Sequence, residues 1–224
     1  MKNIDFRQLE THLQKFFKPT STTNLSRKLL LVRSAESQGN LSGTITGWMD
    51  VRLSDFGRKQ AFRISDVLVK HQQQFASIHS SDLQRCMDTA FYGLAFTSDS
   101  ELIKNSPKLR EMNFGAHEGL HYDGLSKEEK VKLSDPEYQA PNGESWPQVK
   151  QRATEYFSTF GVGNHLVFTH GGLITSYLHH AGVTQMPNNC SFVGLSLQND
   201  KSKDLGALKE LEFVWEFPNI EEDI

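Results

Sequence analysis

The chain has 224 residues, of which 24 are Lys or Arg and 27 are Asp or Glu, so its formal net charge is −3. Its 37% of hydrophobic residues is enough for a sizeable core, and its charge does not support a nucleic-acid-binding surface. No apolar run approaches the ~18 residues of a membrane span, and residues 1–11 carry Asp5 and Glu10 rather than the apolar core of a signal peptide. Two cysteines, Cys86 and Cys190, are too few for a disulfide framework. We therefore expect a cytoplasmic globular protein with buried thiols.

The first eighteen residues have the spacing of an amphipathic helix. Residues 19–24, rich in Thr, Ser and Pro, are typical of a linker. The helix either folds back on the main domain, which we favour, or docks a partner protein. The chain is thus divided into a helical extension and linker (1–28), a main domain (29–217) and a solvated acidic tail (218–224). The apolar stripe of the helix consists of Phe6, Leu9, Leu13, Phe16 and Phe17.

Short apolar runs and helical patterns alternate along the main domain. Helices are expected after Ser54, after residue 82, after Ser145, which forms a capping-box pattern with Gln148, and from Gly171 onward. This alternation predicts an α/β fold, a three-layer α/β/α sandwich with a mostly parallel central sheet. Strands are expected at residues 29–32, 75–78, 102–103, 165–168, 191–197 and 212–217, with the third and the last at sheet edges.

Cationic residues follow three of the predicted strands. Arg33 follows the first strand, and Arg85 lies shortly after residues 79–82, which follow the second. His170 comes after the strand at 165–168 and precedes two glycines at the start of a helix. Ligands of such sheets bind where the carboxyl ends of the strands meet, and guanidinium groups and helix N-termini match phosphoryl oxygens. The sequence therefore predicts a local phosphate pocket in a chain of slightly negative charge.

The remaining histidines show no metal-ligand spacing. His179 and His180 are adjacent on a predicted helix, so they point in different directions. We expect neither a metal nor another cofactor. The eight histidines are His12, His71, His79, His117, His121, His165, His179 and His180.

Six segments resemble, in order, the signature segments of the histidine phosphatase (phosphoglycerate mutase-like) superfamily. The first is Leu-Leu-Val-Arg-Ser-Ala-Glu-Ser-Gln-Gly-Asn at residues 30–40, where the family normally reads Arg-His-Gly-Glu followed by Asn. The resemblance runs from about residue 29 to 197 and leaves the first 28 residues unexplained. The other segments lie at residues 47–57, 80–85, 109–119, 141–145 and 169–172.

The resemblance implies a role for each matching residue. Arg33, Arg85 and His170 would surround the transferred phosphoryl group, and Glu111 would be the general acid that protonates the leaving oxygen. Further phosphate contacts would come from Asn40 and Gly171, and weaker substrate contacts from Thr46 and Gly47.

One departure from the family bears on turnover. The family's nucleophile is the histidine after the first arginine, and Ser34 occupies that position, followed by Ala35 in place of glycine. A serine hydroxyl is a poor nucleophile without an adjacent base, and its phosphate ester persists where a phosphoramidate is labile. Loss of a nucleophile typically costs roughly 10⁴–10⁶ in turnover. The short stretch between Gly119 and Pro141 resembles the phosphatase branch of the family more than the mutase branch.

Two functions remain open from the sequence. One is a phosphatase of reduced activity acting on a phosphorylated small molecule or a phosphoprotein, which retention of Glu111 favours. The other is a non-catalytic phosphate-binding or scaffold protein, with its N-terminal helix docking a partner, which Ser34 favours. Substrate specificity would come from residues 39–50 and 115–143. No nucleic-acid or membrane partner is expected.

Overall fold

The computed structural model describes residues 4–18, 26–95, 102–135, 138–183, 185–198 and 207–218. A six-stranded sheet runs through these residues in the order β3-β2-β4-β1-β5-β6. Strands β1 to β4 pair in parallel, whereas β5 is antiparallel to both of its neighbours. The strands are β1 (Arg27–Arg33), β2 (Phe75–Ser81), β3 (Ile103–Ser106), β4 (Gly163–Thr169), β5 (Phe192–Leu197) and β6 (Leu208–Trp215).

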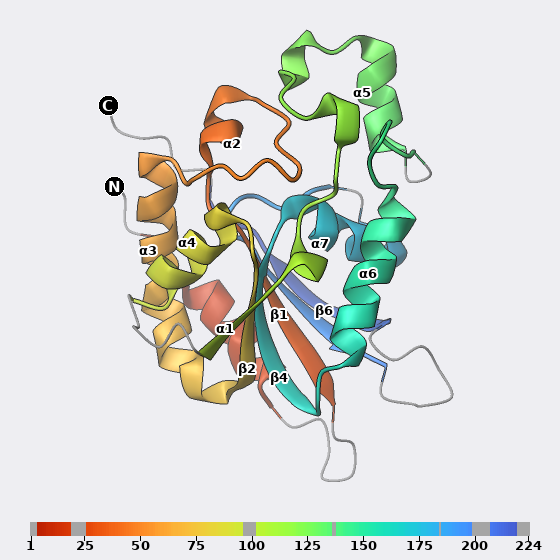
Figure 1. Ribbon diagram of the computed structural model, residues 1–224. Coiled ribbons are helices and arrows are strands. Elements are labelled where there is room, and N and C mark those ends of the chain that lie inside the picture. The colour runs from red at the N-terminus through yellow and green to blue at the C-terminus, as the bar shows by residue number, and fades with distance from the viewer. Residues whose placement is uncertain are drawn as a thin grey trace.

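Helices cover both faces of the sheet, which makes the predicted three-layer α/β fold (Figure 1). One face packs against α1 (Arg7–Phe16), α3 (Asp55–His71) and α4 (Gln84–Gly93), and the other against α6 (Trp146–Ser158) and α7 (Gly171–Leu178). Along β1, Leu30 and Val32 point into the first layer and Leu29 and Leu31 into the second, as expected for a strand buried on both sides. No helix within the described ranges is both long and apolar enough to cross a membrane.

The shorter elements connect these layers. Ser54 caps α3 by accepting from Gly57 N at 2.8 Å, and Ser145 with Gln148 forms the predicted capping box of α6. The remaining helices are α2 (Gln38–Ser42) and α5 (Lys127–Ser134). The 3₁₀ turns are η1 (Gln72–Gln74), η3 (Pro107–Leu109), η4 (Gly115–His117), η5 (Tyr122–Gly124) and η6 (His179–Ala181).

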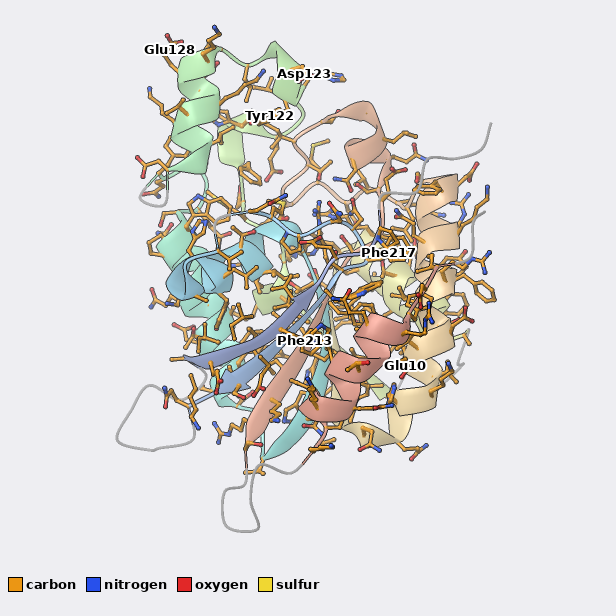
Figure 2. The ribbon with its side chains drawn as sticks, turned by 180° about the vertical axis from the view of Figure 1, so that it is seen from behind. Glu10, Tyr122, Asp123, Glu128, Phe213 and Phe217 are labelled. Carbon is orange, nitrogen blue, oxygen red and sulfur yellow. The ribbon has the colours of Figure 1, made fainter. Side chains whose placement is uncertain are left out.

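The N-terminal helix folds back on the sheet, which was the favoured expectation. Its residues Leu9, Leu13 and Phe16 are buried in the same core cluster as Phe213 of β6. Glu10, on the side toward α3 (Figure 2), accepts a hydrogen bond from His71 Nε2 at 2.7 Å. The apolar stripe is therefore part of the protein's own core. The predicted linker at 19–24 and nearly all of the predicted acidic tail lie outside the described residues.

Five of the six described strands are longer than the sequence predicted, and β5 alone is not. The predicted strands at 102–103, 165–168 and 212–217 became Ile103–Ser106, Gly163–Thr169 and Leu208–Trp215, so the last one starts and ends earlier than expected. The bounds of β1 and β2 bear on the site. β1 begins at Arg27, so the last two residues of the predicted extension belong to the sheet. β2 continues to Ser81, so the prediction that its strand ends at Ile78 was wrong. The polar segment from His79 to Ser81 pairs with β3 and the neighbouring β4, and these ladders satisfy its backbone groups. Ser80 and Ser81 are consequently buried inside the sheet.

Two segments rise above the carboxyl ends of the parallel strands (Figure 1). One carries α2 and the loop that follows it, and the other carries η4, η5 and α5. They pair with each other, because Ile45 N donates to Leu120 O and Tyr122 N donates to Gly43 O, both at 2.9 Å. These two segments therefore enclose the space above the carboxyl ends of the strands, where ligands of parallel sheets bind.

Candidate active site

A pocket of about 440 Å³ opens between the two segments and the sheet. Arg33, the last residue of β1, and Glu111, which follows η3, both line it. The remaining lining residues are Gly39, Asn40, Gly43, Thr44, Ile45, Thr46, Gly47, Phe114, Tyr122, Lys130, Leu133, Trp146, Thr175, His179 and Met186. The pocket therefore contains Arg33, Glu111, Asn40, Thr46 and Gly47 of the predicted site residues.

Arg33 supplies a positive charge near the sheet end of the pocket. Its Nη1 donates to the carbonyl oxygen of Pro187. Burial lowers the pKa of Arg33, the carboxylate of Glu111 opposes this shift, and the nearby Arg85 adds to it. A guanidinium remains protonated under such conditions. Arg33 and Arg85 therefore repel each other, and a bound anion would offset this repulsion.

Arg85 is buried behind the pocket, at the start of α4. Its guanidinium donates from Nη2 to the carbonyl oxygen of Gly47 at 2.7 Å and from Nη1 to that of Met49 at 2.9 Å. Arg85 thus holds the loop that carries Thr46 and Gly47. Arg85 is not one of the described residues that line the pocket, so it contributes its positive charge from behind the lining.

His170 immediately precedes α7, in the N-cap position but without a side-chain capping hydrogen bond, and it is buried. Its Nε2 lies 2.8 Å from Ser81 Oγ and 3.3 Å from Cys86 Sγ. Burial lowers the pKa of His170 far below its usual range, and the charges of Arg85, Arg152 and Arg33 lower it further. The imidazole is therefore neutral at pH 7, and the three basic groups singled out from the sequence gather at one place.

Ser34 lies beside the same cluster. Its backbone N donates to Thr169 O at 2.8 Å, and Asn189 Nδ2 donates to its carbonyl oxygen at 2.8 Å. Ser34 is 4% exposed, and its side chain lies near the thiol of Cys86, whose pKa it influences. Burial raises the pKa of Cys86, so that thiol is protonated and is no base for the hydroxyl. Cys86 is in contact with both Ser34 and His170.

Glu111 is held in a defined position by backbone amides. Met112 N donates to Oε1 at 2.8 Å, and Gly172 N donates to Oε2 at 3.0 Å. A Cβ added to Gly172 would lie only 2.1 Å from Oε1, so this seat needs a glycine at the start of α7. The amide of the second glycine, which the sequence offers as an anion donor, is therefore used by Glu111.

Asn40 lines the pocket and also belongs to the capping box of α2. Its Oδ1 accepts from the backbone N of Ser37 at 3.0 Å and closes the capping box of α2. Asn189 Nδ2 also lies 3.4 Å from this oxygen. The N–H donors of Asn40 are on Nδ2, the atom that a phosphate oxygen would have to reach.

Sequence reasoning missed the residues that support Glu111 from behind. Arg152 of α6 forms a two-bond ion pair with Glu144, with Nε–Oε1 at 2.7 Å and Nη2–Oε2 at 3.0 Å. The same Nη2 donates to the carbonyl oxygen of Glu111 at 2.8 Å, and Trp48 Nε1 donates to that oxygen at 2.7 Å. The sequence pattern predicts the helix that contains Arg152 but not this role, because Glu111 and Lys108, whose carbonyl oxygens it contacts, are distant in the sequence.

Two other histidines form a buried chain of hydrogen bonds away from the pocket. His79 Nδ1 lies 2.9 Å from Tyr156 Oη, and Ser77 Oγ bridges His79 Nε2 and His165 Nδ1 at 2.6 and 2.7 Å. His79 also stacks on Phe160. Burial lowers the pKa of His79 to about 4, with His165 contributing, and burial also lowers the pKa of His165. Both histidines are thus structural and uncharged at pH 7.

We expect the free energy of unfolding to fall as the pH is lowered from about 6.5 to 4. Unfolded His79 binds a proton near pH 6.5 and the folded residue only near 4, so acid favours the unfolded chain, by about 2 kcal/mol at pH 4.5. Urea unfolding at pH 7 and pH 4.5 measures the difference. His79→Gln, which keeps hydrogen-bonding groups but cannot titrate, should flatten the slope. An equal slope in the two proteins would contradict this assignment.

No group of three or more His, Cys, Asp or Glu side chains suited to a metal ion occurs among the described residues. The pocket combines the half-buried guanidinium of Arg33, the carboxyl group of Glu111 and the amide side chain of Asn40, and the neutral imidazole of His170 lies enclosed behind them. Chemically, such a set of groups can hold an anion next to a carboxyl group that can transfer a proton.

The chain belongs to the histidine phosphatase superfamily (branch 1), whose family model matches residues 29–202. It is 32% identical over 160 residues to a 2,3-bisphosphoglycerate-dependent phosphoglycerate mutase of Bartonella tribocorum, covering 68% of this chain and 77% of that protein. It is equally 32% identical over 157 residues to a metal-independent phosphoserine phosphatase of Arabidopsis thaliana, covering 66% and 65%. The phosphoglycerate mutase structure from Thermus thermophilus superposes with a TM-score of 0.64 at 29% identity, over 75% of this chain and 92% of that one.

The resemblance inferred from the six sequence segments is thereby confirmed at the level of the family. The fold is that of phosphoglycerate mutase-like proteins. Both mutases and phosphatases are among the similar proteins, so the comparisons leave the branch and the substrate open.

Proposed function

We propose that this protein is a phosphatase-type member of the family that binds a phosphomonoester and hydrolyses it slowly. The observation that carries the proposal is the joint presence of Arg33 and Glu111 in one pocket. A phosphoryl group needs a fixed cation for its oxygens, and an alkoxide leaving group needs a proton. Pure phosphate binding has no use for the acid, so the retained and well-seated Glu111 favours an enzyme.

The proposed reaction uses groups already in place. The phosphoryl oxygens would bind Arg33, and the amide side chain of Asn40 would donate to them. Arg85 would add its positive charge from behind the pocket. As the bond from phosphorus to the leaving oxygen breaks, Glu111 would give that oxygen its proton. Water would form the new bond to phosphorus and release a proton to the solvent, from which Glu111 is reprotonated. Less effectively, Ser34 or His170 would attack phosphorus first, and water would then hydrolyse the phosphorylated side chain to release phosphate. Family members use a histidine at position 34, and its replacement by Ser34 is the reason for slow turnover.

The phosphatase branch is favoured over the mutase branch by chain length. Only twenty-one residues lie between Gly119 and Pro141. A mutase needs to retain the phosphoryl group between two transfers, which a longer covering segment assists. The segment with η5 and α5 leaves the pocket open at its mouth, as a hydrolase that admits water requires.

A second function is favoured by the surroundings of Ser34. Its side chain is buried beside the protonated thiol of Cys86, and none of the described hydrogen bonds joins its hydroxyl to a base. The alternative is a non-catalytic protein that recognises a phosphorylated small molecule or a phosphoprotein. Steady-state hydrolysis of p-nitrophenyl phosphate separates the two, because a binding protein gives no turnover above background. A rate typical of ordinary phosphatases would instead contradict the proposal that Ser34 limits the chemistry.

Both functions require phosphate binding, which Arg33→Ala should abolish. Phosphate or vanadate at about 100 times its dissociation constant should raise the melting temperature by about 5 °C. The rise should vanish in Arg33→Ala and persist in Arg58→Ala, which removes an exposed arginine on α3. The apo protein should lose little stability in Arg33→Ala, since clustered cations repel one another there. A flat melting temperature in the unmutated chain would remove both proposed functions.

A further inference from the structure

We propose that the pocket selects phosphomonoesters with an uncharged aromatic leaving group over those with a second anionic group. This deepens the proposed function and rests on it, since Arg33 and Glu111 set where the phosphoryl group binds. The inference comes from the part of the pocket beyond these two residues, whose side chains the leaving group would have to contact.

Apolar and aromatic side chains dominate that part of the pocket. Met186 borders the phosphate end, because a Cβ added to Gly171 would meet Met186 Sδ at 2.4 Å and Arg33 Nε at 3.1 Å. A thioether packs favourably against an aromatic ring, and burial of a ring against such walls is favourable in water. The other apolar lining residues are Ile45, Phe114, Tyr122, Leu133 and Trp146.

Trp146 brings the aromatic wall close to the acid. A Cβ added to Gly172 would lie 3.4 Å from Trp146 Cζ3 and 2.1 Å from Glu111 Oε1, so the indole and the carboxylate flank the same glycine. A ring carried by the leaving oxygen would therefore lie along the indole while that oxygen faces Glu111. The volume of about 440 Å³ accommodates a phosphoryl group with a ring of one or two cycles.

Charges for a second anion are scarce in the pocket. Among the described lining residues, Lys130 of α5 is the one lysine or arginine besides Arg33. Its Nζ lies 5.2 Å from the ring centre of Tyr122 and donates to Asp123 O at 3.3 Å, within the segment above the sheet that carries both residues (Figure 2). His179 stands beside Trp146, with 5.6 Å between ring centres, and burial lowers its pKa.

A carboxylate or second phosphate would thus lose hydration without gaining an available cation. Lys130 would have to leave the Tyr122 ring and the Asp123 carbonyl to pair with it, and neutral His179 offers at most a hydrogen bond. Burying an ion without a partner is costly, whereas an uncharged ring needs none. The lining therefore disfavours acidic leaving groups because it offers few cations, and it favours aromatic leaving groups because its walls are apolar and aromatic.

Non-hydrolysable phosphonates test the proposal independently of turnover. Isothermal titration calorimetry of the full chain would give dissociation constants for inorganic phosphate, methylphosphonate, phenylphosphonate and 3-phosphonopropionate. We expect phenylphosphonate to bind roughly tenfold more tightly than methylphosphonate. We expect 3-phosphonopropionate, which adds a carboxylate, to bind no more tightly than methylphosphonate.

Matched variants on α5 locate the effect. Leu133→Asn should remove most of the phenyl advantage and leave the affinity for inorganic phosphate unchanged. Val131→Asn, at an exposed position of the same helix that does not line the pocket, should leave both unchanged. Lys130→Met should leave the preference for phenylphosphonate intact.

The possible outcomes separate this proposal from the one it rests on. Binding of inorganic phosphate with equal affinity for phenyl- and methylphosphonate would overturn the aromatic preference and leave the phosphate site standing. Tighter binding of 3-phosphonopropionate that is lost in Lys130→Met would overturn it in favour of an acidic substrate. Failure of all four ligands to bind would contradict the phosphate site itself.

Discussion

Ser34→His should increase the hydrolysis of p-nitrophenyl phosphate at least about a hundredfold over the unmutated chain. An imidazole at this position attacks phosphorus without needing a neighbouring base, and its phosphoramidate is cleared quickly by water. Arg33, Arg85 and Glu111 already surround the position or line the adjoining pocket, so the substitution completes a site whose electrostatics are in place. Steady-state kinetics at pH 6–7 measures the gain, mainly in kcat.

The thiol of Cys86 decides how large this gain is. It lies near Ser34 and 3.3 Å from His170 Nε2, so a larger ring at position 34 competes with it for space. Ser34→His combined with Cys86→Ala should therefore exceed Ser34→His alone. Adding Glu111→Gln to the double variant should remove most of the gain by removing the proton donor. If neither histidine variant gains activity, the pocket has decayed beyond its nucleophile and the slow-enzyme proposal is wrong.

Arg152→Ala should lower the free energy of unfolding by about 3 kcal/mol. The substitution leaves the largely buried carboxylate of Glu144 without its cation and takes a donor from the carbonyl oxygens of Glu111 and Lys108. Among the described residues, the carbonyl oxygen of Glu111 then keeps only Trp48 Nε1 as a donor, so activity of the Ser34→His background should fall as well. Urea unfolding and steady-state assays measure the two effects.

Glu155→Ala is the matched control for Arg152→Ala. It removes an ion pair of the same helix, with Lys108, in which both side chains are about half exposed. Such a pair contributes at most about 1 kcal/mol, and its loss should not alter activity. Equal destabilisation by the two substitutions would show that Arg152 acts as an ordinary surface residue.

Local patterns in the sequence were sufficient for α1, α3, α4, α6 and α7 and for the family, whereas α2 and α5 were not predicted. The spacing of Leu9, Leu13 and Phe16, the cap at Ser54 and the capping box at Ser145 depend on neighbours within one or two turns, which the sequence displays directly. Strand ends were less predictable. The end of β2 at Ser81 follows from pairing with two other strands and not from its polar residues.

The sequence by itself determined that Arg33, Arg85 and His170 follow strands of an α/β sheet, and that serine stands where the family has its nucleophile. Only the tertiary structure decided which of them meet the pocket: Arg33 lines it, whereas Arg85 and His170 lie enclosed behind it. Only the tertiary structure likewise showed that Arg152 and Gly172 support Glu111 and that Cys86 lies next to Ser34. The physical reason is that strand order and helix packing bring together groups far apart in the chain, and burial and hydrogen bonding then depend on those distant partners rather than on the local sequence.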